Sequence, residues 1–121
     1  MERLRAFLVQ AGLPADPVTL ERYRRYMEEV LKRNESVNLT AIREPEAFEQ
    51  KHLIDSLALW RFKGFASADS VLDVGTGAGL PGIPLAIAAP EKAFLLMDSV
   101  RKKLLAVEQI AEKIGLTNVK I

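Results

Sequence analysis

The chain has 121 residues, of which 49% are hydrophobic and 27% are charged, and its formal net charge is +1. This composition is that of an ordinary globular domain and excludes disordered and fibrous proteins. The chain has no cysteine and one histidine, so a disulfide framework, a thiolate metal site and an imidazole cluster are excluded.

Two helices are predicted at the amino terminus. The apolar residues from Leu4 to Ala11 recur at helical spacing and stop at Gly12 and Pro14, which predicts a short amphipathic helix. Asp16 is expected to cap a second helix, which starts at Pro17 and continues to about Asn34.

A third helical segment is expected to begin at Pro45. Four residues of this segment, together with Trp60, could share one apolar face: Phe48, His52, Leu53 and Leu57.

Beyond residue 70 the apolar period changes. The run Val71–Val74 is short, apolar and bounded by turn residues, which predicts a buried parallel strand. After a Gly-rich turn, Pro81 is expected to start a helix with the apolar body Ile83–Ala89. Pro90 stops this helix before a second strand, Ala93–Met97.

The last elements complete an alternating pattern. Ser99 is expected to cap a helix that Gly115 closes, and Val119–Ile121 reads as a third strand. Helices followed by β-α-β-α-β predict an α/β fold. The β-α-β-α-β part is the first half of a doubly wound, Rossmann-like parallel sheet, which is apparently truncated. We expect an amino-terminal helical segment at 1–66 and a partial cofactor-binding domain at 67–121.

The Gly-rich turn has the sequence Asp73-Val74-Gly75-Thr76-Gly77-Ala78-Gly79. Its three glycines allow positive φ angles and let a ligand approach the main chain. The N–H groups around Gly79 to Gly82 are expected to face outward and to receive a carboxylate, such as that of a methionine moiety.

The spacing of the loop favours S-adenosylmethionine over a dinucleotide. A dinucleotide site favours G-x-G-x-x-G, whereas this loop has G-x-G-x-G preceded by Asp73. Asp98 ends the second strand, where a carboxylate can accept both hydrogen bonds of a ribose diol. Asp73 is expected to orient the loop and to meet the ligand amine, directly or through water. Each aspartate alone reads equally well as a strand-end cap or turn former.

The expected cofactor-binding residues are Asp73, Gly75, Thr76, Gly77, Ala78, Gly79, Leu80, Pro81, Asp98 and Ser99.

The segment from Val71 to Ala86, VLDVGTGAGLPGIPLA, resembles the bacterial small-subunit ribosomal RNA guanine-N7 methyltransferases, also called the glucose-inhibited division protein B family. Asn38–Ile42 and His52–Ser56 support the resemblance, which covers nearly the whole chain. Family members are about twice as long, so the strands that complete the adenine pocket and the guanine-facing side are expected to be missing here.

The resemblance implies methyl transfer from S-adenosyl-L-methionine to guanine N7 of small-subunit ribosomal RNA. Guanine N7 already carries an in-plane lone pair, so alignment and electrostatics can supply catalysis and no catalytic residue is assigned. This chain alone is expected to be inactive. The alternatives are an NAD(P)-dependent oxidoreductase domain and a non-catalytic fragment that binds cofactor or self-associates, as a dimer or by strand exchange.

Five further residues match family positions whose segments pack beside the cofactor loop: Asn38, Thr40, His52, Asp55 and Ser56. From the residues alone, Asn38 and Thr40 also read as turn and cap formers, and His52 as a hydrogen-bonded structural residue.

Three residues are candidates for an RNA contact: Arg101, Lys102 and Lys103. Three cations in the first turn of a helix oppose its dipole, and a phosphate would relieve this. A solvated charged face is nevertheless the favoured reading of these residues, and the net charge shows no bulk basic character.

No apolar run approaches the roughly 20 residues that span a bilayer, and the charged segment Met1–Arg5 leads into no long apolar region. We therefore expect a cytoplasmic protein that has no membrane contact and no metal.

Overall fold

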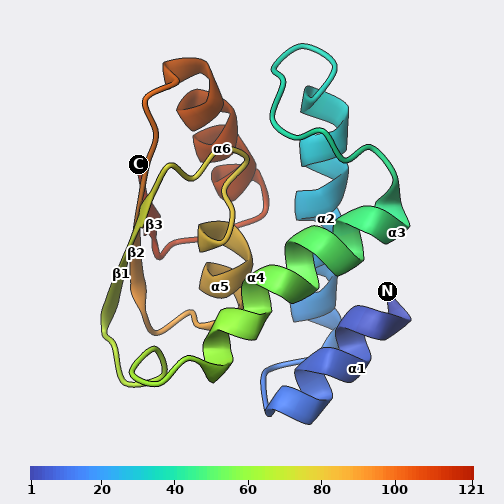
Figure 1. Ribbon diagram of the computed structural model, residues 1–121, viewed down its shortest axis with the longest axis vertical. Coiled ribbons are helices and arrows are strands. Elements are labelled where there is room, and N and C mark those ends of the chain that lie inside the picture. The colour runs from blue at the N-terminus through green and yellow to red at the C-terminus, as the bar shows by residue number, and fades with distance from the viewer.

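Helices form the amino-terminal part of the molecule and a small parallel sheet dominates the rest in the computed structural model, which describes residues 1–121 (Figure 1). The elements are α1 (Glu2–Ala11), α2 (Pro17–Arg33), α3 (Pro45–Phe48), the π-helix η1 (Glu49–Ile54), α4 (Asp55–Leu57), the 3₁₀-helix η2 (Ala58–Arg61), β1 (Ser70–Val74), α5 (Gly82–Ala88), β2 (Ala93–Met97), α6 (Arg101–Lys113) and β3 (Val119–Lys120). This order confirms the predicted α/β fold with a partial, Rossmann-like sheet.

The three strands are parallel and lie in the order β1-β2-β3. Both crossovers run in the same direction, so their right-handedness places α5 and α6 on the same face of the sheet (Figure 1). Asp73, Phe94 and Leu96 point into this covered face and are buried. The residues that alternate with them along β1 and β2, including Leu72 and Leu95, are exposed on the other face.

The helix ends predicted near the amino terminus are confirmed. Gly12 ends α1 with a φ of 73°, in the left-handed region that favours glycine. The Asp16 side chain accepts hydrogen bonds from the backbone N–H and hydroxyl of Thr19 at 3.2 and 2.7 Å, and Pro17 follows in the first turn of α2.

The third helical segment begins at Pro45 as predicted, but it is not one regular helix. It passes through the π-helix η1 and ends as the 3₁₀-helix η2. Glu49, the first residue of η1, is buried, and its carboxylate accepts a hydrogen bond from the Leu4 N–H at 3.0 Å. Because α1 has no side-chain cap of its own, Glu49 satisfies one of its free amides.

Three boundaries near the sheet differ from the sequence predictions. Ser99 does not cap α6; Val100 holds the N-cap position, and no side chain there bonds the helix. Asp98 accepts a hydrogen bond from the Val100 N–H at 2.8 Å, which fixes the residue before α6 but does not cap the helix. Pro81 lies just before α5, after a cis Leu80–Pro81 peptide, and β3 ends at Lys120.

One hydrophobic core joins the helices to the sheet. Its 25 buried residues come from both sides of position 66 and include Tyr26 of α2, Leu57 of α4, Ile83 of α5 and Val107 of α6. The division at 1–66 and 67–121 stays a prediction.

No helix has the length and apolar character needed to cross a membrane.

Candidate functional site at the carboxyl ends of β1 and β2

The Gly-rich loop leaves the carboxyl end of β1 and leads into α5, in the upper half of the molecule in Figure 1. Gly75, Gly77 and Gly79 have φ angles of 76°, 58° and 95°, which confirms that the loop uses left-handed backbone conformations. At Gly79 packing adds a second requirement, because a Cβ atom would lie 2.6 Å from Cγ1 of Ile83.

Asp73 ties the two ends of this loop together. Its buried Oδ2 accepts hydrogen bonds from the hydroxyl of Thr76 at 2.7 Å and from the N–H of Gly82 at 3.0 Å. Burial raises the pKa of Asp73, while these two donors act in the opposite direction. The geometry agrees with the predicted orienting role, and contact with a ligand amine stays a prediction.

Asp98 connects the end of β2 to the loop. One carboxylate oxygen accepts from the Gly77 N–H and the other from the Val100 N–H, both at 2.8 Å. The hydrogen bond from Val100, followed by that from Gly77, holds the pKa of Asp98 below its usual value, and the charge of Lys103 contributes. Each oxygen of a carboxylate has a further lone pair, so Asp98 keeps acceptor capacity for a ribose diol.

The prediction that the N–H groups around Gly79 to Gly82 face outward is wrong. The amides of Gly79 and Leu80 both donate to the carbonyl of Thr76 at 2.9 Å, Gly82 donates to Asp73, and Pro81 has no N–H. The turn therefore closes on itself. The amide of Ala78 is the one N–H from Gly75 to Leu80 without an acceptor in the protein.

Tyr26 of α2 is a loop contact that the sequence reasoning missed. Its hydroxyl donates a hydrogen bond to the carbonyl of Ala78 at 2.8 Å. No motif signals this contact, because the two residues are 52 positions apart.

The five upstream candidates do not hydrogen-bond to the loop or to Asp98. Thr40 Oγ1 and His52 Nε2 lie 2.7 Å apart, and Asn34, another missed residue, accepts from the Thr40 N–H at 3.0 Å. Burial lowers the pKa of His52. Asn38 and Asp55 are exposed and Ser56 is buried. A structural role thus accounts for Thr40 and His52, while proximity to a ligand stays a prediction for all five.

Arg101, Lys102 and Lys103 lie in the first turn of α6, immediately after Asp98. Arg101 and Lys102 are exposed, and none of the three forms a salt bridge. A positive surface therefore borders the candidate site.

No group of three or more metal-ligating side chains occurs in the chain.

The chain matches one protein family and is similar to several curated proteins. The family described as rRNA small subunit methyltransferase G matches residues 19–121. The chain is 40% identical over 119 residues to the ribosomal RNA small subunit methyltransferase G of Aeromonas hydrophila, and 39% identical over 118 residues to that of Haemophilus ducreyi. These alignments cover 98% of this chain but 54% and 57% of the two relatives. The chain thus spans about half the length of the curated relatives that it matches.

Proposed function

Because the chain belongs to the rRNA small subunit methyltransferase G family, we propose that it is the cofactor-binding part of an enzyme that methylates small-subunit ribosomal RNA. The methyl donor is S-adenosyl-L-methionine and the acceptor is guanine N7. The observation that carries the proposal is the Gly-rich loop anchored by Asp73 and Asp98 at the carboxyl ends of two parallel strands. Ligands of open α/β sheets bind at these strand ends.

The residues of the loop fit the parts of the cofactor. Asp98 has acceptor capacity for the two ribose hydroxyls, and the unpaired amide of Ala78 is a donor for the methionine carboxylate. The positive φ angles of Gly75 and Gly77 expose the main chain without a Cβ atom, and an added Cβ atom would meet no neighbouring atom at either position. Open space there leaves room for the ligand.

The reaction depends on the alignment of methyl donor and acceptor more than on acid–base catalysis. When bound, S-adenosylmethionine supplies a methyl group on a sulfonium, which guanine N7 can attack with its in-plane lone pair. The contribution of this chain is to hold the donor in place and to attract RNA phosphates with Arg101, Lys102 and Lys103. We propose that the enzyme acts in the cytoplasm, where ribosomes are assembled.

Calorimetric titration with S-adenosylhomocysteine and with NADH tests this proposal. The chain is expected to bind S-adenosylhomocysteine and to give no heat with NADH. Heat with NADH alone would support the NAD(P)-dependent oxidoreductase instead. Gly77→Val is a useful variant, because φ strain and occlusion of the loop should abolish binding by the folded protein.

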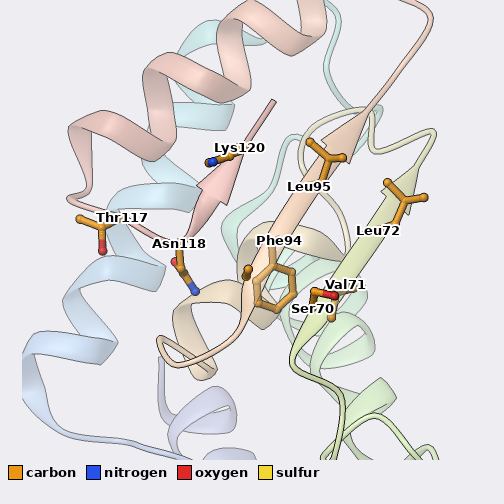
Figure 2. Close-up of a pocket in the computed structure, with 9 residues that line it drawn as sticks. Ser70, Val71, Leu72, Phe94, Leu95, Thr117, Asn118 and Lys120 are labelled. Carbon is orange, nitrogen blue, oxygen red and sulfur yellow. The ribbon is translucent and has the colours of Figure 1, made fainter.

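We also propose that the chain by itself associates with a second copy through its uncovered sheet face. Leu72 and Leu95 are paired in register, and Figure 2 shows their side chains next to each other on neighbouring strands. Val74 and Met97 extend this exposed apolar row, and a hollow of about 430 Å³ adjoins it near the amino ends of the strands. Parallel sheets are normally buried on both faces, and the outer edge of β1 has no partner strand.

A further inference from the structure

Tyr26 joins the helical part of the chain to the Gly-rich loop. It lies on α2, which packs against α5 and α6, and its side chain is completely buried. Its ring meets Phe48 edge-on, with the ring centroids 5.9 Å apart, so its position is defined by packing on the helical side. The hydroxyl then reaches the carbonyl of Ala78 at 2.8 Å.

With this hydrogen bond, one peptide group of the loop is held at both its carbonyl and its N–H. The Ala78–Gly79 peptide is held at its carbonyl by Tyr26 and at its N–H by the carbonyl of Thr76, at 2.9 Å. Because a peptide group is planar, bonds at both ends prevent it from rotating. One residue earlier, the Gly77 N–H is held by Asp98. The free amide of Ala78 lies between these two anchored groups.

We propose that Tyr26 is a positioning residue for the cofactor: its hydroxyl holds the loop in the conformation that leaves Gly75 and Gly77 open to the ligand. This inference rests on the proposed function. A loop that is already ordered binds its ligand without the cost of ordering at the moment of binding. The loss of this one hydrogen bond should therefore weaken binding even though Tyr26 does not touch the ligand.

Two further observations support a defined role for the hydroxyl. Ala78 is 3% exposed, so without Tyr26 its carbonyl would have little access to water as a replacement donor. Burial raises the pKa of the Tyr26 hydroxyl, and the nearby charge of Asp73 acts in the same direction. The hydroxyl therefore stays protonated and remains a donor at all working pH values.

Tyr23 provides a matched control on the same helix. It is also completely buried, and its hydroxyl donates to a backbone carbonyl, that of Pro84, at 3.4 Å. Pro84 belongs to α5 and not to the loop. Tyr26→Phe and Tyr23→Phe thus each remove one buried hydroxyl from α2, and only the first removes a contact with the loop.

The test compares the two variants and the parent chain by titration with S-adenosylhomocysteine, after urea unfolding has shown that all three are folded. Tyr26→Phe is expected to weaken binding by about 3- to 10-fold, the effect of one hydrogen bond, and Tyr23→Phe by less than about 2-fold. Amide hydrogen exchange supplies a readout that a general loss of stability would not produce. Exchange at Gly79 and Leu80 of the loop should accelerate relative to α5 in Tyr26→Phe only.

The outcomes separate the two proposals. If the parent chain does not bind S-adenosylhomocysteine, the proposed function fails whatever the variants do. If the parent binds and the two variants bind equally well, with equal exchange at Gly79, Tyr26 does not position the loop and the inference is wrong. Weaker binding and faster loop exchange confined to Tyr26→Phe would support it.

Discussion

Replacement of Gly82 by alanine tests how tightly the loop is packed against the sheet. Gly82 is the first residue of α5, it is buried, and its N–H donates to Asp73 at 3.0 Å. Its φ angle lies outside the left-handed region, so alanine meets no backbone strain there. On helix propensity alone, alanine should stabilise the protein by up to about 1 kcal/mol.

Packing predicts the opposite sign. A Cβ atom on Gly82 would lie 2.3 Å from Cδ2 of Leu96 and 2.9 Å from Oδ2 of Asp73. Leu96 is completely buried and has little room to move, and overpacking of this kind costs about 1–3 kcal/mol. Displacement of Asp73 also weakens its hydrogen bond with Gly82, which contributes about 1 kcal/mol. We therefore expect Gly82→Ala to lower the free energy of unfolding by about 1–3 kcal/mol after the gain in propensity.

Urea unfolding followed by circular dichroism measures this loss. Leu96→Val serves as the matched background, because valine lacks the Cδ atom that the new methyl group would strike. In that background Gly82→Ala should cost clearly less than in the parent chain. A Gly82→Ala variant as stable as the parent would refute the close packing inferred between α5 and β2.

Three further changes test the site and the surfaces around it. Asp98→Ala should weaken S-adenosylhomocysteine binding by about 10- to 100-fold, since it removes charge-assisted hydrogen bonds to the ribose and the anchor of Gly77; unchanged affinity in the folded variant would remove Asp98 from the site. The double change Lys102→Ala with Lys103→Ala should reduce affinity for small-subunit ribosomal RNA and flatten its salt dependence, with cofactor affinity unchanged. Equal salt slopes would identify the lysines as a solvated face. By light scattering, we expect the parent chain to be associated and Leu72→Glu to be monomeric. Val18→Glu alters another exposed apolar residue, on α2, and should leave association intact; a monomeric parent would refute the association.

The local features of this protein could be predicted from its sequence. Asp16 followed by Pro17 marks the start of α2, and Gly12 marks the end of α1, because caps and breakers act on backbone groups within a few residues. The same holds for the loop, where closely spaced glycines indicate positive φ angles. The order of strands and helices then limits the fold to a parallel sheet with right-handed crossovers.

The partners of the polar groups were decided by the tertiary structure. Glu49 caps a helix that begins more than 40 residues earlier, and Tyr26 holds a loop 52 residues later. Val100 holds the N-cap position that Ser99 was expected to fill, and its N–H donates to Asp98. Each contact depends on which elements pack together, and a buried polar group takes whichever partner packing brings within reach. The spacing of residues in the sequence does not show which of them lie close together in space, so these contacts become visible only in the folded chain.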